Sequence, residues 1–389
     1  MKISDIGRDN RCRGCGVCAA VCPAGAIAME LNSQGFFYAS VEDDRCIQCG
    51  KCEQVCTVIS EGMSSQKVQA VYYAYQLNEE RRMQSSSGGI AGALAEAAIK
   101  DGYKIIGASY RVKHAVVEDA KSYYSQIAGS KYVPSNTLEA FSKIGEMDKV
   151  LVIGTPCQIQ ALKRAYPHKK NLLCIDFRCY GVCGYGLWDK YIQSIRKKFQ
   201  KRITHINFRS KKASWLKWGV EICFENGARY FKPKTKDSFG RIFSGFENAG
   251  RHCLECRASE QNSFADLRLE DGWQLSKFLT KDDYKKGASQ VTIMSEKGME
   301  LWEKTLTKLY YRDVGIEHGL HGCRKHPYKE DLNRLIDDPD MGIEDVIREY
   351  GGGIPVLTRF FYWGCDLLLD FPGFYFFLKR VYRKLWKID

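Results

Sequence analysis

The sequence lacks the marks of an exported or membrane-spanning chain. Its first ten residues, MKISDIGRDN, contain no apolar segment, so we expect no secretory leader. No run of about 20 apolar residues is free of charged side chains, which argues against a helix that crosses a membrane. The composition also excludes collagen-like, mucin-like and wholly disordered chains. We therefore expect a folded, cytoplasmic protein.

Signatures of several enzyme classes are missing as well. The seven histidines show no metal-ligand spacing, no Ser/His/Asp order stands out, and the Cys-x3-Cys-x2-Cys run of S-adenosylmethionine radical enzymes does not occur. Cysteine, in contrast, is abundant, with 17 among 389 residues. A chain of this length that is 44% apolar can bury a core without disulfides. Without an export signal, its cysteines are better explained as metal ligands.

Eight of the cysteines lie before residue 60, in two copies of one pattern. The copies are Cys12-x2-Cys15-x2-Cys18-x3-Cys22-Pro23 and Cys46-x2-Cys49-x2-Cys52-x3-Cys56. Three closely spaced thiolates can wrap an iron–sulfur cubane, and the fourth then reaches the other cubane. This predicts two 4Fe–4S clusters, one held by Cys12, Cys15, Cys18 and Cys56 and the other by Cys46, Cys49, Cys52 and Cys22.

A pair of zinc knuckles is the alternative for this segment. Zinc sites usually take two pairs of ligands separated by a longer loop, and the repeated triplets do not follow that pattern. Residues 1–60 instead resemble bacterial two-cluster ferredoxins. They depart from them at one position, because Cys56 is followed by Thr57 and not by proline.

After a small polar linker at 61–67, apolar strands alternate with helices. The expected strands are 68–75, 104–110, 149–153 and 172–177, and the expected helices are 89–100, 158–165 and 187–199. Shorter strands follow at 203–208, 220–224 and 229–232, the last two joined in a hairpin at Asn226-Gly227. The predicted fold class is α/β. A ferredoxin-like α+β module (1–60) precedes a larger α/β domain with a mixed sheet (68–330) and a helical, aromatic and basic tail (331–389).

Four later cysteines are candidates for a third cluster, which would be the next redox centre of an electron-transfer path. They are Cys157, Cys179, Cys253 and Cys256, with Cys183 as a substitute for Cys179. Thr155-Pro156-Cys157 stands where a strand turns into a helix, and a helix N-terminus lowers the pKa of a nearby thiol. The alternative for each cysteine alone is a buried structural role, which we expect for Cys174.

The segment Ser85-Ser86-Ser87-Gly88-Gly89 leads into the helix at 89–100. Backbone N–H groups and the helix dipole there suit an anion such as a flavin phosphate, and glycine allows close approach. The segment Gly129-Ser130-Lys131-Tyr132 can add a cation and an aromatic ring to the same ligand. The alternative is a plain helix cap without a ligand.

Charge is unevenly distributed. Residues 196–236 hold 13 Lys and Arg against two Glu, which accounts for most of the net charge of +13. This stretch is either a solvated face or a docking surface for an anionic partner, and no nucleic-acid-binding motif accompanies it. Residues 359–378 are rich in aromatic side chains and are followed by cations. They predict a C-terminal helix packed on the core, or else a peripheral contact with the inner membrane face.

Taken in order, these motifs resemble the beta-subunit family of coenzyme F420 hydrogenase/dehydrogenase. Over about the first 300 residues, the resemblance is carried by the ferredoxin-like head, SSSGGIAGALAEAAIKDGYKIIGASY, GSKYVPS, VLVIGTPCQIQALK, LLCIDFRCYGVCGYGLW, CLEC and FADLRLEDGW. It implies that the larger domain binds FAD. It also implies that electrons move between iron–sulfur clusters, flavin and an organic acceptor.

The resemblance also assigns roles to single residues. Cys157 matches the cysteine of the family's Gly-Thr-Pro-Cys-Gln, Cys179 matches the first residue of its Cys-His-Gly-Val, and Cys253 with Cys256 matches its later pair. Asp266 and Asp271 match a late Ala-Asp…Gly-Asp-x-Trp pattern. The cofactor-binding candidates are Ser87, Gly88, Gly89, Lys131, Tyr132, Thr155 and Asp271.

Three positions depart from the family pattern near the expected substrate end. Tyr180 stands where the family usually has His, Cys183-Gly184 replaces Pro-Ser, and Glu270 replaces the Gly before Asp271. Substrate identity is therefore not transferred. Tyr180 is a candidate proton donor in place of the histidine, with a purely structural tyrosine as the alternative.

Three functional hypotheses follow from these patterns. The first is an iron–sulfur flavoprotein oxidoreductase that acts with a redox partner such as ferredoxin on a small organic substrate. The second is an electron-transfer subunit without a substrate site, docked through its basic stretch to a larger enzyme. The third is a zinc-stabilised basic binding protein, which a brown, flavin-containing preparation would exclude.

Overall fold

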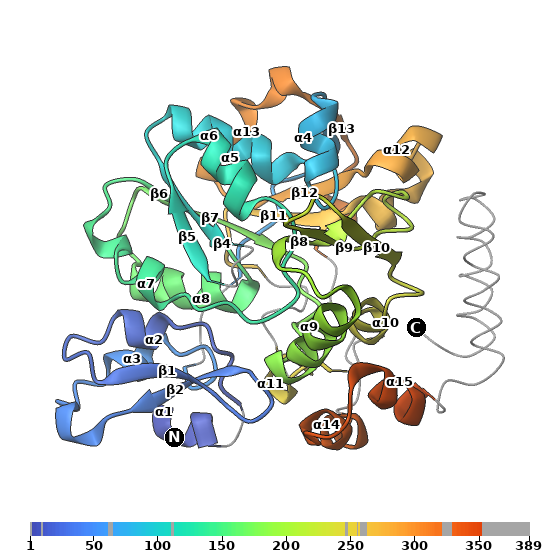
Figure 1. The fold of residues 1–389 in the computed structure, drawn as a ribbon. Helices are drawn as coiled ribbons and strands as arrows, with labels where there is room; N and C mark the ends of the chain where they lie inside the picture. The colour runs from blue at the N-terminus through green and yellow to red at the C-terminus, as the bar shows by residue number, and fades with distance from the viewer. Residues whose placement is uncertain are drawn as a thin grey trace.

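The computed structural model describes residues 2–8, 11–60, 65–109, 113–245, 248–254, 256, 263–320 and 329–351. Within these ranges there are three sheets: a two-stranded sheet in the N-terminal head, a central eight-stranded sheet, and a three-stranded sheet that is inserted in the chain between the seventh and eleventh strands (Figure 1). The head lies below helix α8 and strand β5 at one end of the central sheet (Figure 1).

The head, residues 2–60, contains three short helices and an antiparallel hairpin. Its elements are α1 (Ile3–Arg8), α2 (Val17–Ala20), β1 (Ile27–Leu31), β2 (Phe37–Val41) and α3 (Lys51–Val55). Gly16 and Gly50 each follow the second cysteine of a motif, have φ of 74° and 71°, and directly precede α2 and α3. Glycine adopts this left-handed conformation without strain, so both motifs turn into a helix in the same way.

The central sheet mixes parallel and antiparallel neighbours in the order β13-β3-β12-β11-β7-β6-β4-β5. Strands β4, β6, β7 and β11 are parallel, and the remaining pairs are antiparallel. Strands β4, β6 and β7 are mainly apolar because both faces of the sheet are covered there. The strands are β3 (Ala70–Gln76), β4 (Lys104–Ala108), β5 (His114–Val117), β6 (Val150–Ile153), β7 (Leu172–Phe177), β11 (Leu267–Asp271), β12 (Ser289–Ile293) and β13 (Leu309–Asp313). The predicted mixed α/β fold is confirmed.

Alternate residues of the central strands face two different cores. Val150 and Val152 of β6 pack with α7, α8 and the head, whereas Leu151 packs with α5 and α13. Head residues such as Val17 belong to the first core. The head is therefore packed against the α8 face of the sheet and is not held by the linker alone. The helices are α5 (Ile90–Lys100), α7 (Leu138–Phe141), α8 (Pro156–Ala165) and α13 (Glu296–Glu303).

A third core surrounds the three-stranded sheet. The strands β8 (Ile203–Ser210), β9 (Gly219–Phe224) and β10 (Arg229–Pro233) are antiparallel, and the predicted hairpin turn at Asn226-Gly227 joins the last two. Their apolar side chains pack against four helices. These are α9 (Tyr185–Phe199), α10 (Ser238–Ser244), α14 (Glu330–Asp337) and α15 (Ile343–Gly351). Residues 330–351 thus share a core with α9.

Short elements connect these layers. They are α4 (Glu79–Gln84), α6 (Ala120–Ser122), α11 (Arg251–Leu254), α12 (Lys281–Lys286), the π-helix η2 (Tyr123–Ile127) and the 3-10 helices η1 (Asp43–Arg45), η3 (Ile144–Glu146), η5 (Gly272–Phe278), η6 (Leu306–Lys308) and η7 (Ile316–His318). In the described part of the chain, no helix has both the length and the apolar character that crossing a membrane requires. The aromatic tail expected at 359–378 lies outside the described residues.

The basic stretch at 196–236 is not one solvated surface. Lys211 is only 2% exposed, and its Nζ donates hydrogen bonds to the carbonyl oxygens of Arg82, Ser87 and Lys286 at 2.5, 2.7 and 2.6 Å. The expectation that Lys211 belongs to an exposed docking surface is wrong. Its ammonium group instead ties together the ends of α4 and α12 and the serine segment.

The buried His114 on β5 gives a prediction about acid stability. Its Nδ1 lies 2.7 Å from Ser135 Oγ, and burial lowers the pKa of His114 to about 3. The unfolded chain therefore binds a proton near its ordinary pKa of about 6.5 while the folded chain does not, so stability falls as the pH drops below that value. Between pH 7 and 5.5, His114 should cost about 1 kcal/mol of unfolding free energy.

Anaerobic urea unfolding at both pH values tests this expectation. His114→Phe should remove that part of the pH dependence, whereas His168→Phe, at an exposed position, should keep it. An identical pH slope in wild type and His114→Phe would contradict the assignment.

Candidate metal centres and the adjoining polar site

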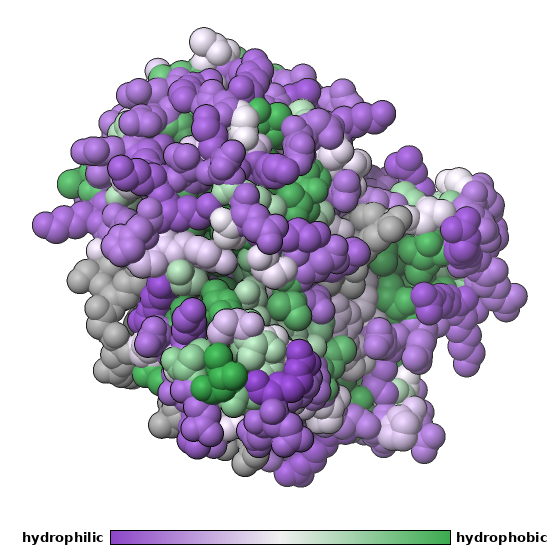
Figure 2. Space-filling view, turned by 90° about the vertical axis from the view of Figure 1, so that its left-hand side faces the viewer, coloured by the Kyte–Doolittle hydropathy of each residue, from purple (hydrophilic) through white to green (hydrophobic). Residues whose placement is uncertain are grey.

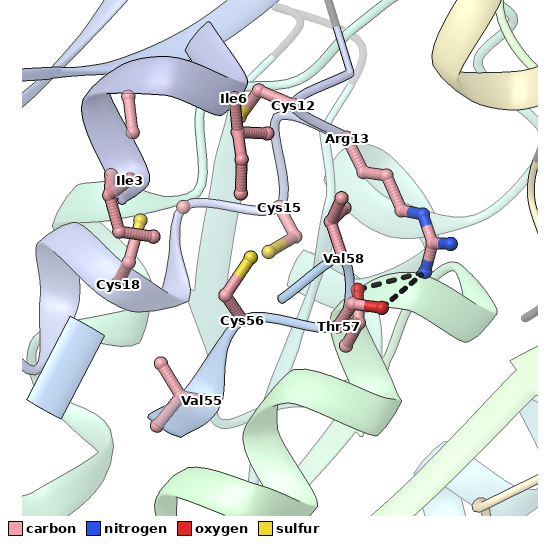
Figure 3. A pocket seen from close by; sticks show the side chains of 12 residues that line it. Ile3, Ile6, Cys12, Arg13, Cys15, Cys18, Val55, Cys56, Thr57 and Val58 are labelled. Carbon is pink, nitrogen blue, oxygen red and sulfur yellow. Dashed lines mark hydrogen bonds between the residues drawn. The ribbon is translucent and has the colours of Figure 1, made fainter. Parts of the chain in front are cut away.

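The four cysteines predicted to hold the first cluster lie around one cavity, although they come from both motifs. Cys12, Cys15, Cys18 and Cys56 line it together (Figure 3). Apolar side chains of α1 (Ile3, Ile6), of the end of α3 (Val55) and of the segment that follows it (Val58) line the same cavity. The fold thus places Cys56, the fourth cysteine of the second motif, beside the first three cysteines of the first motif.

Burial raises the pKa of the Cys12, Cys15 and Cys18 thiols, and neighbouring thiols raise it further. Thiolates in such an apolar cavity need a positive centre beside them. The irons of a cubane supply that charge, so the donor set fits a 4Fe–4S cluster. Among the described residues, no group of three or more His, Cys, Asp or Glu side chains is arranged to hold a single metal ion.

The second predicted set lies nearer to solvent. Cys49 is exposed, while Cys22, Cys46 and Cys52 are half-buried. Burial is the main cause of the raised pKa of Cys52, and Glu53 is the next. Cys22 also contributes, so the fourth cysteine of the first motif lies near the second motif. The Sγ of Cys22 accepts a hydrogen bond from the N–H of Ala26 at 3.3 Å.

Cys157 lies in the first turn of α8, at the carboxyl end of β6, as predicted. Gln158 Oε1 accepts a hydrogen bond from the backbone N–H of Thr155 at 2.9 Å, and the Thr155 hydroxyl lies 3.1 Å from Cys157 Sγ. The expected lowering of this thiol's pKa is wrong. Burial outweighs the hydroxyl and the helix N-terminus and raises the pKa of Cys157 to about 11, with Cys256 as the next cause.

The structure brings Cys157 together with the later pair. Burial raises the pKa of Cys253, and Cys256 and Cys157 are its next causes. A Cβ placed on Gly181 would lie 3.6 Å from Cys253 Sγ, so the turn after Cys179 contacts this group. The Sγ of Cys179 accepts the N–H of Gly181 at 3.4 Å.

Two other cysteines remain near the β7 edge. Cys183 is buried, and Cys253 contributes to the rise of its pKa. Cys183 therefore lies near Cys253, as the turn after Cys179 does. Cys174 is fully buried within β7, and burial raises its pKa to about 12. Its surroundings fit the structural role expected from the sequence.

The serine and glycine segment is bound to its surroundings by its own side chains. Ser87 Oγ donates to the carbonyl of Ala288 at 2.5 Å, and Ser86 Oγ lies 2.8 Å from Ser130 Oγ. A Cβ on Gly88 would lie 2.7 Å from the Ala74 carbonyl, so this glycine permits close packing on β3. Gly89 precedes α5 directly. The contact between Ser86 and Ser130 brings the two predicted flavin segments side by side.

The segment 129–132, the second of the two predicted flavin segments, continues into a buried polar cluster. Lys131 Nζ donates to the carbonyls of Ile127, Ala128 and Gly129, and burial lowers the pKa of Lys131 to about 7. Tyr132 stacks on Phe243 with 3.9 Å between ring centroids. The amine of Lys131 is thus engaged with the end of η2.

Arg209, which sequence reasoning passed over, joins Tyr132 to Asp271. Its Nη2 lies 2.8 Å from Asp271 Oδ2, and it is also hydrogen-bonded to the Tyr132 hydroxyl. Burial alone would lower the pKa of Arg209, but Asp271 and Tyr132 raise it above its ordinary value. The Nε of Arg209 and the Nε1 of Trp215 are buried without a hydrogen-bond partner among the described residues. Two such donors fit an anionic or carbonyl-bearing ligand.

Two of the three positions that depart from the family pattern, Tyr180 and Glu270, lie near Arg178. Its guanidinium lies 5.3 Å from the centre of the Tyr180 ring and 3.9 Å from a carboxylate oxygen of Glu270. These residues stand at the carboxyl ends of the neighbouring parallel strands β7 and β11, the sheet edge at which ligands of α/β proteins bind.

Asp266 has a structural role. It is 2% exposed and accepts hydrogen bonds from Lys163 Nζ, the backbone N–H of Cys174 and Ser295 Oγ. These bonds connect α8, β7 and the start of α13, which explains the residue without a ligand.

Comparison with known proteins matches two parts of the chain. Residues 147–316 match the family described as the C terminus of the coenzyme F420 hydrogenase/dehydrogenase beta subunit, and residues 11–59 match the 4Fe–4S dicluster domain. A curated relative, coenzyme F420-dependent sulfite reductase of Methanocaldococcus jannaschii, is 30% identical over 171 residues. That match covers 42% of this chain and spans about a quarter, 26%, of the relative's length.

A solved structure is similar at low identity. It is a chain of the F420-reducing NiFe hydrogenase complex from Methanosarcina barkeri, xenon-derivatised, with 18% identity and a TM-score of 0.44. The likeness covers 75% of this chain and 94% of that one. The dicluster match confirms the predicted pair of 4Fe–4S clusters in the head over the zinc alternative.

Substitution of the crossing cysteines tests the ligand assignment. Cys56→Ala should remove the same cluster as Cys12→Ala, although the two residues lie in different motifs, because they line one cavity. Cys22→Ala should remove the other cluster, as Cys46→Ala does. Iron and sulfide content and the electron paramagnetic resonance signal of each reduced variant distinguish the sets, and loss of different signals in Cys12→Ala and Cys56→Ala would contradict the crossing.

Proposed function

Because the chain belongs to the coenzyme F420 hydrogenase/dehydrogenase beta-subunit family and carries a 4Fe–4S dicluster domain at residues 11–59, we propose that it is an iron–sulfur flavoprotein oxidoreductase. Electrons pass between the two head clusters, a third cluster and FAD, and from there to or from an organic substrate or a deazaflavin. The observation that carries this proposal is the attachment of the head to the body beside Cys15. The Cys15 carbonyl accepts a hydrogen bond from Thr137 of the body, and Cys157 is the largest cause, after burial, of the raised pKa of Cys15.

The chain holds the residues proposed to bind these redox centres in fixed positions. When bound, a cubane carries one electron at a time, and a flavin exchanges one electron with a cluster and two with an organic molecule. Thr137 Oγ1 donates to the carbonyl of Cys15 at 3.0 Å, and Arg164 of α8 donates to the carbonyl of Cys56 at 3.1 Å. Both bonds tie the first cluster site to the body, so the separation between Cys15 and Cys157 does not vary with a flexible linker.

Electrons exchange with a partner protein at the second site in this proposal. Cys49 is exposed there, and the neighbouring Ile47 is 64% exposed. The face of the molecule that includes the head is otherwise mainly hydrophilic, with small separate apolar patches (Figure 2). An exposed cluster ligand beside an exposed apolar side chain suits a transient contact with a redox protein.

The flavin in this proposal lies at the polar cluster between the serine segment and Asp271. Ser86 and Ser130 join the two predicted segments, and Arg209 Nε and Trp215 Nε1 supply buried donors for polar groups of the ligand. Arg178, Tyr180 and Glu270 at the ends of β7 and β11 then line the substrate side. Tyr180 remains a proposed proton donor.

A second candidate is an electron-transfer subunit without its own substrate site. The observation that favours it is coverage, because the matched stretch spans only 26% of the sulfite reductase relative. Co-purification with a stoichiometric partner, together with no turnover by the isolated chain, would support this candidate over the first.

Analysis of one anaerobic preparation tests the proposal. Iron and sulfide should be present in amounts that correspond to three 4Fe–4S clusters, together with one flavin per chain. Material with two clusters and no flavin would overturn the flavoprotein assignment.

Cys157→Ala should interrupt the path inside the protein. Dithionite should still reduce the two head clusters, while the rate at which the flavin is reduced from the head should fall about tenfold or more. Stopped-flow spectra at cluster and flavin wavelengths measure both steps. Cys174→Ala is the control, because Cys174 is a buried cysteine on the neighbouring strand β7 to which no ligand role is assigned. A normal flavin rate in Cys157→Ala would exclude Cys157 from the path.

Ile47→Asp should weaken the contact with a protein donor. Reduction of the head by a reduced bacterial ferredoxin should slow several-fold, because a charge replaces an apolar contact residue, while reduction by dithionite should not change. Leu31→Asp, at another exposed apolar position of the head (48% exposed), is the control. Equal ferredoxin rates in wild type and Ile47→Asp would place the contact elsewhere.

A further inference from the structure

The buried Lys211 joins the three-stranded sheet to the serine segment 85–89. Lys211 follows β8 directly, and its Nζ donates to the carbonyl of Ser87 at 2.7 Å. It also donates to the carbonyl of Arg82 in α4 at 2.5 Å and to that of Lys286 in α12 at 2.6 Å. A lysine ammonium offers three N–H donors and no acceptor, which suits a position ringed by three carbonyl oxygens.

A register shift in the small sheet brings Lys211 to this position. The pairing of β8 with β9 shifts between Asn207 and Ser210, and an irregularity of this kind re-aims the side chains beside it. Arg209 then reaches Asp271 at the end of β11, at 2.8 Å, while Lys211 reaches the serine segment. This short stretch of the inserted sheet therefore contacts both regions between which the flavin is proposed to lie.

The loop beyond Lys211 is docked on the end of α12. The N–H of Trp215 donates to the carbonyl of Lys285 at 2.8 Å, and the Trp215 indole stacks on Trp273 with 3.6 Å between ring centroids. Trp215 is fully buried, and its Nε1 has no hydrogen-bond partner among the described residues. A buried donor of this kind suits an acceptor group of a ligand. Lys211 thus anchors a loop that carries a donor of its own.

The contact with Lys211 fixes which way the peptide groups of the serine segment face. The Ser87 carbonyl is directed to Lys211, and the next carbonyl, that of Gly88, accepts the N–H of Gln76 on β3 at 2.8 Å. The C=O and N–H groups of a trans peptide point in opposite directions. The N–H of Gly89 therefore faces away from β3.

Three N–H groups at the start of α5 are left for a ligand. Those of Gly89, Ile90 and Ala91 have no acceptor among the residues that the structure describes. A helix cannot satisfy its first N–H groups by itself, and together with the helix dipole they suit an anionic group such as a phosphate. The direction in which they point depends on the peptide groups before them, and Lys211 holds one of these.

We propose that Lys211 is a positioning residue of the flavin site, which holds the Ser87 carbonyl inward and so directs the N–H groups at the start of α5 toward the phosphate of the bound flavin. This rests on the function proposed above, which places the flavin at the serine segment. Lys211 acts through that segment, because its own Nζ is engaged with three carbonyl oxygens.

The simpler interpretation is that Lys211 only fastens α4 and α12 to the small sheet. The two interpretations differ in how binding depends on the ligand. A structural tie affects every flavin to the same extent. A positioning role affects FAD, which carries phosphate, and spares riboflavin, which carries none.

Equilibrium binding of FAD and of riboflavin to anaerobic, flavin-depleted protein separates these interpretations. Lys211→Met keeps the apolar stem and removes the donors. Its Kd for FAD should rise on the order of tenfold, since hydrogen bonds to a charged group are misplaced, while its Kd for riboflavin should stay within about twofold of wild type. Iron and sulfide content reports whether the variant is folded.

Tyr73→Phe is the matched control. The Tyr73 hydroxyl is buried and donates to Asp283 of α12 at 2.6 Å, so its removal also deletes a tie to α12, but one that does not include the serine segment. Both Kd values should stay near wild type in this variant.

An unchanged Kd for FAD in Lys211→Met would overturn the proposal, and so would an equal loss of affinity for FAD and riboflavin. If Lys211→Met does not fold, Lys211→Gln carries the same comparison with the same criteria, because its amide is one atom too short to reach all three carbonyl groups. Failure of the proposed function is distinguishable, because the wild-type protein then binds neither flavin.

Discussion

Thiol groups gathered in an apolar cavity resist ionisation, and this constraint governs the centre of the molecule. Burial raises the pKa of Cys15, Cys18, Cys157 and Cys253, and the thiols next to one another add to the effect. Such a set is stable as thiolates only beside positive charge. Iron supplies that charge in a 4Fe–4S protein.

The fold places these groups by simple means. Two copies of one cysteine pattern turn into α2 and α3 through Gly16 and Gly50, and the chain path brings Cys56 back to the first motif. The parallel strands β6 and β7 end at the same edge, where Cys157 and the turn after Cys179 follow them. The head packs on the face of the sheet that carries α8, so the first cluster site lies against the turn that carries Cys157.

Local patterns predicted much of this arrangement. The cysteine spacing indicated two clusters, and the runs of apolar residues located β6, β7, α5 and α9 closely. Expectations that depended on solvent exposure were less successful. A helix N-terminus should lower the pKa of Cys157, but burial raises it, and Lys211 was expected on a charged surface but lies buried among three carbonyl groups. Composition and spacing do not report burial, and burial decides both cases.

The sequence by itself determined the 4Fe–4S dicluster character of the head and the mixed α/β class, because short-range spacing and periodicity are enough for each. Only the tertiary structure decided that Cys15 lies near Cys157 and that Arg209 joins Tyr132 to Asp271. These are contacts between segments more than 60 residues apart in most cases, as for the 62 positions between Arg209 and Asp271. Such contacts depend on how whole layers pack, which no local pattern encodes.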